Sequence, residues 1–417
     1  MNEPAQLIAD MGRKARAAFA KLTGVSDAQK SDALVAAAQN LRAAQSSILA
    51  ANQRDMDGAR SRELSDSMLD RLMIDEDRLE AIAAAVENVA KLPDPVGQII
   101  DRGARPNGLV MERVRVPLGV IGIIYESRPN VTADAAALTL RSGNAVILRG
   151  GSEAIESNRA IFEAMSAGLV KAGLPENAIQ LVQITDREAV GAMLKASGLI
   201  DIIIPRGGKS LVKRVQDEAR VPVLAHLDGV CHSFIDKDAD QAKAIAIAVN
   251  AKMRRTGICG AMETLLIDQD YPAPGPLLRA LIDAGCEVRG DDAVLELDER
   301  IVSADDSDWG TEYLAPIVSV AMVNGVDEAL AHIAEHGSHH TDVIVTEDLP
   351  TAEIFIQRAD SAIVMHNASS QFADGGQFGL GAEIGISTGR LHARGPVALE
   401  GLTTYKWVVR GTGQVRP

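Results

Sequence analysis

Aromatic residues are scarce in this sequence, since Phe, Trp and Tyr together make up only 3% of its 417 residues. The hydrophobic core must therefore be aliphatic, and the apolar content of 47% is ordinary for a globular protein. Basic residues are also outnumbered: 42 Lys and Arg stand against 57 Asp and Glu, a net charge of −15. This charge argues against nucleic acid or an anionic membrane as a partner, so an anionic substrate would need a local basic cluster.

Long apolar runs and paired cysteines are missing as well. The longest apolar runs span about eight residues, far short of the roughly 20 that a membrane-spanning helix requires. The N-terminal residues carry acids and no apolar segment, unlike a signal peptide. The three cysteines are odd in number and show no CxxC or Cys/His ligand spacing, which excludes a disulfide framework. We expect a soluble, cytoplasmic protein.

Helix and strand signals alternate along most of the chain. Residues 1–92 have the apolar spacing of helices, with Asp27 and Ser65 as expected N-caps. Strands and helices then alternate from Val120–Tyr125 to Val221–Ala225, and again from residue 233 to residue 366. The uniformly apolar Val120–Tyr125 is typical of a strand buried on both faces of a parallel sheet. The pattern predicts an α/β fold with two doubly wound parallel domains.

Two glycine turns follow neighbouring strands of the first series. Each places glycines, a basic side chain and a Ser before a helix, where free N–H groups can hold phosphate. The candidate residues are Arg149, Gly150, Gly151 and Ser152 in one turn, and Arg206, Gly207, Gly208, Lys209 and Ser210 in the other. Two such turns suit a dinucleotide. A plain loop stays the alternative for each, because no GxGxxG occurs and Ile203 replaces the leading Gly of a P-loop.

Cys259 lies at the centre of the segment Met253–Thr264, between a predicted helix and an apolar strand. The flanking glycines 257 and 260 let the backbone approach whatever the sulfur touches. Lys252, Arg254 and Arg255 lie just upstream, and nearby positive charge favours the nucleophilic thiolate. Cys259 is therefore a candidate nucleophile, with a small buried core residue as the alternative.

Two histidine patterns suggest metal ligands but lack support. His332-Ile-Ala-Glu-His336 fits the H-x-x-E-H zinc-protease pattern, yet no distal acidic ligand stands out. His226, Cys231 and His232 have a spacing that matches no standard zinc site. The sequence thus predicts no metal.

Six segments resemble the γ-glutamyl phosphate reductase family of the aldehyde dehydrogenase superfamily. They are Pro117–Asn130, Gly143–Glu153, His226–His232, Arg255–Thr264, Gly337–Asp342 and Gly381–Thr388. The resemblance runs from the N-terminal helices to the last strand. It implies NADPH/NADP-dependent reduction of L-glutamate 5-phosphate to L-glutamate 5-semialdehyde and phosphate, a step of proline biosynthesis, through a Cys259 thioester. It also implies a homo-oligomer, a dimer or tetramer, and glutamate 5-kinase as a candidate partner.

The resemblance further implies roles around the reacting carbon. The Cys259 N–H and the Asn130 amide are candidates for the oxyanion hole, although Arg128 competes with Asn130 for that alignment. Arg128, Arg254 and Arg255 are candidates to hold the phosphoryl group or the substrate carboxylate. His226 stands where hydrolytic relatives carry a general-base Glu, and that departure favours acyl-phosphate chemistry.

The cofactor roles rest on two further positions. Arg149 replaces a Lys near the adenine ribose, and a guanidinium there suits the 2′-phosphate of NADPH. Glu312 resembles the glutamate that holds the nicotinamide ribose, with an exposed acid as its alternative. The competing functions are a hydrolytic or CoA-acylating aldehyde dehydrogenase and, more remotely, a catalytically silent nucleotide-binding assembly subunit.

The expected domain division follows. Residues 1–107 and 119–232 form the cofactor-binding domain with its helical lead-in, and residues 233–366 form the catalytic domain. Residues 108–118 and 395–417 form a small β oligomerisation arm, and residues 367–394 form a Gly-rich return segment. The amphipathic strands 109–116 and 403–410 lack an evident partner in either domain, so we expect both to pair across a subunit interface.

Overall fold

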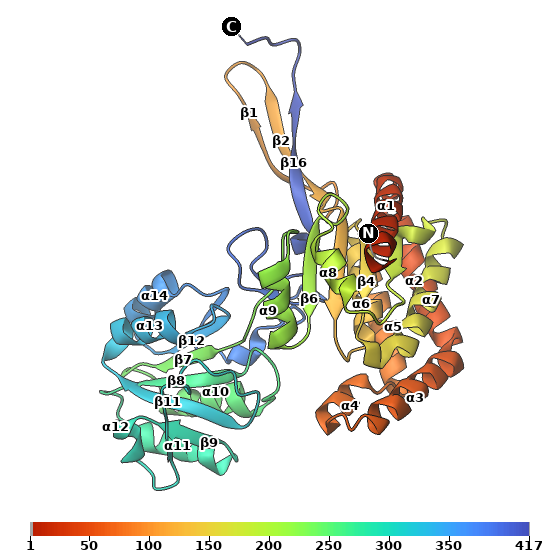
Figure 1. Cartoon of the computed structure of the whole chain (residues 1–417). Helices are drawn as coiled ribbons and strands as arrows, with labels where there is room; N and C mark the ends of the chain where they lie inside the picture. Colours follow the sequence, from red (N-terminus) through yellow and green to blue (C-terminus); the bar gives the residue numbers. More distant parts are fainter. Residues whose placement is uncertain (1–2, 417) are drawn as a thin grey trace. The chain divides into compact units, whose positions relative to one another are not determined.

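The computed structural model describes residues 3–416 and divides into two compact units (Figure 1). The first unit contains the chain up to Ala225, Leu380–Gly385, and the chain from Val397 onward. The second unit contains His226–Gly379 and Ile386–Pro396. The expected boundary at residue 232 was too late, because the strand beginning at Cys231 belongs to the second sheet. The return segment is likewise not one piece but is divided between the units.

The N-terminal region is helical, as predicted. Its helices are α1 (Glu3–Leu22), α2 (Asp27–Ala43), α3 (Gln45–Ser61), α4 (Asp66–Leu72) and α5 (Glu76–Lys91). Ser65 caps α4 as expected, accepting a hydrogen bond from the Met68 N–H. The prediction that Asp27 caps α2 was wrong. Ser26 is the cap: its Oγ accepts the Gln29 N–H at 3.3 Å, and Asp27 is already helical.

The first unit holds a four-stranded parallel sheet in the order β5-β4-β3-β6. Its strands are β3 (Val120–Tyr125), β4 (Ala145–Arg149), β5 (Ile179–Leu181) and β6 (Ile202–Arg206). The helices between and after them are α6 (Asn130–Arg141), α7 (Ile155–Lys171), α8 (Glu188–Leu194) and α9 (Lys209–Glu218). The expected strand Val221–Ala225 was wrong. Only one isolated bridge, Ile203 to Val223, forms there, because Pro222 has no N–H to continue a ladder.

Helices of the first unit pack closely around this sheet. β3 is buried along its whole length, as its apolar sequence predicts. α1 packs on β4 and α8, while α7 packs on α2 and α3. A Cβ at Gly168 would lie only 2.4 Å from the Ala37 backbone, so glycine is what permits the close approach of α7 to α2.

The second unit holds a seven-stranded parallel sheet in the order β10-β9-β11-β8-β7-β12-β13. The strands are β7 (Cys231–Ile235), β8 (Met262–Asp268), β9 (Glu287–Gly290), β10 (Val302–Ser303), β11 (Ile317–Val323), β12 (Thr341–Val345) and β13 (Ile363–His366). The helices are α10 (Gln241–Met253), α11 (Pro274–Asp283), α12 (Asp292–Leu295), α13 (Gly325–His336) and α14 (Leu349–Arg358). None of the helices formed by residues 3–416 has the length and apolar character of a membrane-spanning helix.

The core of the second unit lies on both faces of its sheet. Leu265 belongs to an apolar cluster that includes Leu278 of α11, whereas the next residue, Leu266, belongs to a cluster that includes Phe355 of α14. Successive strand side chains point to opposite faces, so helices cover both sides. This arrangement confirms the predicted doubly wound α/β fold.

Three strands form a separate antiparallel sheet in the order β1-β2-β16: β1 (Ile99–Ala104), β2 (Val110–Pro117) and β16 (Thr403–Arg410). Figure 1 shows them as a ribbon extending from the rest of the first unit. The expectation that β2 and β16 lack a partner in either domain was wrong, because they pair with each other from Thr403↔Pro117 to Arg410↔Val110. Their pairing across a subunit interface stays a prediction. β1, which was expected in the cofactor-binding domain, completes this arm.

Candidate active site

Cys259 lies in the turn between α10 and β8 and is half-buried. The backbone at Gly229 passes directly against it: a Cβ there would lie 2.2 Å from the Cys259 carbonyl oxygen. The buried Cys231 thiol donates to the same carbonyl at 3.1 Å. The segment that leads into β7 therefore supports the Cys259 backbone from within the second unit.

Two imidazoles lie beside the Cys259 sulfur. One ring nitrogen each of His226 and His340 and the Cys259 Sγ lie within 4.8 Å of one another. The two rings meet edge to face, with centroids 5.0 Å apart. His340 is fully buried, and burial, together with the neighbouring His226, lowers its pKa to about 3. His340 is thus a neutral imidazole near neutral pH.

Hydrogen bonds orient both rings. His226 Nδ1 lies 2.8 Å from the carbonyl oxygen of Ile386. A carbonyl only accepts, so His226 Nδ1 carries a proton, and in the neutral ring the lone pair lies on Nε2. His340 Nδ1 lies 2.9 Å from the Thr341 hydroxyl, and its Nε2 has no hydrogen-bond partner among residues 3–416.

The basic residues before Cys259 do not act as one cluster. Lys252 is fully buried and forms an ion pair with the Glu263 carboxylate. Because this pairing offsets its charge, the expectation that Lys252 favours the Cys259 thiolate was wrong. Arg254 and Arg255 are exposed. Arg254 donates one hydrogen bond to the Gln371 side chain at 3.2 Å.

Gln371 holds the segment that leads to Cys259. Its amide nitrogen donates to the backbone carbonyls of Ala251 at 2.8 Å and Arg255 at 3.2 Å. Sequence reasoning missed this residue, because it lies far along the chain in a short 3₁₀ turn without a motif of its own. It also gave His340 no role, although His340 lies in one of the segments that carried the family resemblance.

Glu312 lies next to the same site. One of its carboxylate oxygens accepts the Gly229 N–H at 2.9 Å. Because Gly229 contacts the Cys259 backbone, Glu312 lies near Cys259, and it is only half-exposed. Its predicted contact with the nicotinamide ribose stays a prediction.

The remaining candidates lie at the carboxyl ends of strands in the first unit. Arg149, at the end of β4, is buried and donates to the carbonyls of Gly150 at 3.0 Å and Thr185 at 3.3 Å. Its Nε has no partner within the described part of the chain. A Cβ at Gly150 would meet the Asn158 amide at 2.1 Å, so this turn admits no larger residue.

The second glycine turn already holds an anion from the chain itself. The Gly208 N–H, at the start of α9, donates to the Glu126 carboxylate at 3.0 Å. The N–H expected to bind phosphate there is therefore engaged by Glu126. Arg206 is half-buried, whereas Gly207, Lys209 and Ser210 are exposed.

Arg128 lies in the loop between β3 and α6, and Asn130 is the first residue of α6. Asn130 is exposed, and its amide donates to Asp134 at 2.9 Å. Burial raises the pKa of Asp134 to about 6. Glu153 accepts hydrogen bonds from the Ser127 N–H and hydroxyl at 2.6 and 2.8 Å, which ties this loop to the β4 turn.

Comparison with known proteins agrees with this geometry. The model of the aldehyde dehydrogenase family matches residues 3–284. The chain is 68% identical to the γ-glutamyl phosphate reductase of Rhizorhabdus wittichii over 411 residues, which cover 99% of this chain and 96% of the relative. The chain belongs to the γ-glutamyl phosphate reductase family. This confirms the family that the sequence motifs predicted, and it makes the chain an oxidoreductase of the aldehyde dehydrogenase type.

Solved structures extend the comparison. The crystal structure of the γ-glutamyl phosphate reductase of Thermotoga maritima is 43% identical, with a TM-score of 0.96, and the match covers 98% of this chain and 100% of that one. An acetylating aldehyde dehydrogenase from Geobacillus thermoglucosidasius is 17% identical, with a TM-score of 0.71 over 100% of this chain and 98% of that one, which shows the shared fold alone.

Aldehyde dehydrogenases use a nicotinamide cofactor, and the first unit of this reductase fits one at the β4 turn. The glycines there leave no room for side chains, and the buried Arg149 guanidinium retains a donor without a partner among the described residues. A phosphate group needs such a donor. The β4 turn fits better than the α9 turn, where Glu126 is already bound.

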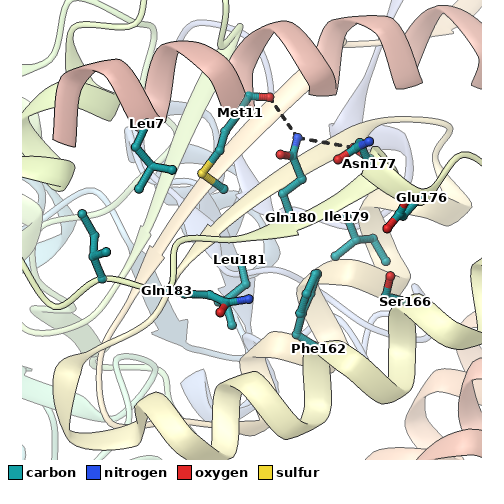
Figure 2. A pocket seen from close by; sticks show the side chains of 11 residues that line it. Leu7, Met11, Phe162, Ser166, Glu176, Asn177, Ile179, Gln180, Leu181 and Gln183 are labelled. Atoms are coloured by element: carbon teal, nitrogen blue, oxygen red, sulfur yellow. Dashed lines mark hydrogen bonds between the residues drawn. The ribbon is translucent and has the colours of Figure 1, made fainter. Parts of the chain in front are cut away.

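A cavity of about 390 Å³ lies elsewhere in the first unit of this reductase (Figure 2). It lies between Leu7 and Met11 of α1, Phe162 of α7 and Leu181 of β5. Figure 2 shows the Gln180 amide bound to the Met11 carbonyl at its edge, at 2.9 Å. None of the predicted site residues lines this cavity, so we do not assign it to the active site.

Proposed function

We propose that this chain catalyses the NADPH-dependent reduction of L-glutamate 5-phosphate to L-glutamate 5-semialdehyde and phosphate, in proline biosynthesis. The relatives that are 68% identical over nearly their whole length carry the name of this activity. The observation that carries the proposal is the environment of Cys259. This residue is half-buried, its carbonyl accepts a hydrogen bond from the Cys231 thiol, and its sulfur lies beside the rings of His226 and His340. That environment suits a covalent nucleophile better than a core cysteine.

The proposed chemistry begins at the Cys259 sulfur. The thiolate attacks the acyl carbon, the C–S bond forms, and the C–O bond to phosphate breaks as phosphate leaves with the electron pair. The lone pair on His226 Nε2 is the candidate acceptor of the thiol proton. When bound, the nicotinamide supplies the hydride that reduces the thioester carbon. The C–S bond then breaks, which releases the aldehyde and regenerates the Cys259 thiolate.

The tetrahedral oxyanions on this path need fixed donors. The Cys259 N–H and the Asn130 amide are the proposed pair, and a single such donor contributes roughly 3 kcal/mol where it has been tested. Asn130 uses one amide hydrogen on Asp134, so its second hydrogen is the one proposed for the oxyanion. Arg128 stays the competing candidate for this role.

Substrate anions require positive charge, because the protein as a whole carries −15. We assign the phosphoryl group and the carboxylate to Arg128, Arg254 and Arg255. Arg254 and Arg255 are exposed, which suits contact with a substrate. Arg254 engages Gln371 through one nitrogen and has others for a ligand.

NADPH is the proposed cofactor. Arg149 would contact the 2′-phosphate, and Glu312 would contact the nicotinamide ribose. The backbone of the β4 turn would hold phosphate with Gly150, Gly151 and Ser152, and Arg206, Gly207, Gly208, Lys209 and Ser210 are the further candidates. The buried, partly unpartnered Arg149 supports this proposal, and the Glu126 contact makes the α9 turn the weaker part of it.

Assembly and substrate supply are also proposed. β16 exposes Tyr405, Trp407 and Val409, and its outer edge has no neighbour among the strands of residues 3–416. An exposed apolar strand edge favours pairing with a second copy, so we propose a homo-oligomer formed through the arm.

Because an acyl phosphate is labile, glutamate 5-kinase is the proposed supplier of L-glutamate 5-phosphate.

The decisive experiment is NADP⁺ reduction by pyrroline-5-carboxylate, the cyclised semialdehyde, with and without inorganic phosphate. The proposal expects turnover only with phosphate. Turnover with water alone would identify a hydrolytic dehydrogenase, and turnover that needs CoA would identify an acylating one. No turnover in any of these conditions, from a folded protein, would favour the silent assembly subunit.

A further inference from the structure

His226, Cys259 and His340 form a set of zinc-type ligands that their sequence spacing does not show. Imidazole nitrogen and thiolate sulfur are the ligands that Zn²⁺ prefers, and one such atom from each residue lies within 4.8 Å of the other two. The residues come from the start of the second unit, the turn before β8 and the position just before β12. The fold thus gathers three ligands that sequence analysis did not connect.

The surroundings of the two histidines match those of metal ligands. A ligating histidine usually donates its other ring N–H to a carbonyl or another oxygen, which fixes the tautomer. His226 does this through Nδ1 to the Ile386 carbonyl, and His340 Nδ1 faces the Thr341 hydroxyl. Nδ1 makes this contact in both rings, so the metal-binding atom would be Nε2 in each. His340 Nε2 is buried and has no hydrogen-bond partner within residues 3–416.

We propose that Zn²⁺ binds to His226 Nε2, His340 Nε2 and Cys259 Sγ, and that it inhibits the enzyme by occupying its nucleophile. Around tetrahedral Zn²⁺, nitrogen and sulfur ligands lie roughly 3.3–3.6 Å apart, so the three side chains must close by about 1 Å. The fourth position would hold water. Mg²⁺ and Ca²⁺ prefer oxygen ligands and should not bind here.

Zinc and substrate would then compete for one sulfur. A Cys259 thiolate bound to Zn²⁺ cannot form a thioester, and an acylated Cys259 cannot ligate the metal. Cys231 would not replace it, because burial raises the pKa of its thiol well above the ordinary value and its proton is donated to the Cys259 carbonyl. Zinc binding needs only these side chains, whereas the inhibition rests on the proposed role of Cys259 as the nucleophile.

Co²⁺ and Zn²⁺ titrations of the whole protein, without substrate or cofactor, test the site. We expect one Co²⁺ per chain, with the intense visible bands of tetrahedral coordination and a thiolate-to-cobalt charge-transfer band, both lost when Zn²⁺ displaces it. Cys259→Ser should abolish the charge-transfer band. His226→Asn and His340→Asn should each weaken Zn²⁺ binding by at least about 100-fold. Cys286→Ser and His339→Asn, outside the cluster, should bind as the wild type does.

A second measurement needs no variant and so avoids any folding defect from replacing the buried His340. Zn²⁺ should slow the alkylation of Cys259 by iodoacetamide at least about 10-fold, followed by mass spectrometry, and a chelator should reverse the effect. Mg²⁺ should have no effect. Equal alkylation rates with and without Zn²⁺, or a Co²⁺ spectrum without thiolate character, would overturn the proposal whatever the enzyme assays show.

Discussion

The Lys252 ammonium and the Glu263 carboxylate form a fully buried ion pair across the base of the turn that carries Cys259. The second Glu263 oxygen accepts the Leu314 N–H at 3.4 Å, and the Tyr313 ring lies 5.9 Å from the Lys252 nitrogen. The pair thereby links the end of α10, the start of β8 and the segment before β11. Loss of this ion pair should therefore lower the stability of the second unit and loosen the conformation of the Cys259 turn.

Glu263 should make stability depend on pH. Burial raises its pKa from 4.5 to about 7, so between these values the folded protein holds a proton that the unfolded chain has released. The bound proton adds to the free energy of unfolding in full below pH 4.5. This added stability is lost as the pH rises to about 7, which lowers the free energy of unfolding by up to about 3 kcal/mol. In urea unfolding across this range, Glu263→Gln should remove that slope. The exposed Glu299→Gln should retain it, and a Glu263→Gln curve parallel to the wild type would contradict the prediction.

Removing one partner of this pair should cost more than removing both. At pH 9, above the folded pKa of Glu263, Lys252→Met leaves that carboxylate buried and uncompensated, which should lower the free energy of unfolding by about 3–5 kcal/mol. The double variant Lys252→Met with Glu263→Gln leaves no buried charge and should recover most of that loss. Chemical denaturation of the two single variants and the double variant measures the coupling. Additive losses would show that the two side chains do not interact as the structure indicates.

Cys259→Ala should lower kcat for the proposed reduction by at least about 1,000-fold, since no other thiol can form the thioester. NADPH affinity, measured by fluorescence titration, should stay unchanged, because the cofactor candidates in the first unit are untouched. Cys286→Ala provides the matched control: this thiol is buried in the apolar core of the second unit. Retained turnover in Cys259→Ala would exclude the covalent mechanism.

Acid should destabilise the second unit through His332. Its ring lies between those of Trp309 and His232, and burial, with the neighbouring His232 and His336, lowers its pKa from 6.5 to about 3. As the pH falls from 6.5 toward 3, the unfolded chain binds a proton that folded His332 does not, so stability falls with it.

Replacing this imidazole should therefore flatten the acid response. His332→Gln should show a smaller loss of unfolding free energy between pH 6.5 and the acid transition than the wild type, measured by urea unfolding at several pH values. The exposed His339→Asn should leave the slope as it is. An unchanged slope in His332→Gln would mean that other groups cause the acid sensitivity.

Arg149→Lys should reduce the preference for NADPH. A charge-assisted hydrogen bond contributes about 1.5–3 kcal/mol, so KM for NADPH should rise about 10- to 100-fold while KM for NADH changes little. Steady-state kinetics with both cofactors measure this. Arg220→Lys, at an exposed residue after α9, is the control. An equal change for both cofactors would remove Arg149 from 2′-phosphate recognition.

Much of the fold could be predicted because buried strands have little choice of sequence. Val120–Tyr125 was expected as a strand and has those bounds in the structure, since it is almost wholly apolar. Val221–Ala225 looked similar, but Pro222 lacks the N–H that would continue the ladder. Sequence alone also left β2 and β16 without a partner, because register between distant strands depends on where the domains bring them.

The candidate site divides in the same way. The sequence by itself determined the family, the alternation of strands and helices, and Cys259 between its glycines, because these depend on local patterns along the chain. Only the tertiary structure decided that Lys252 is neutralised by Glu263, that Gln371 holds the turn, and that His340 lies beside the sulfur. These contacts join residues distant in the sequence, and burial then sets their charge states through desolvation, which no local pattern records.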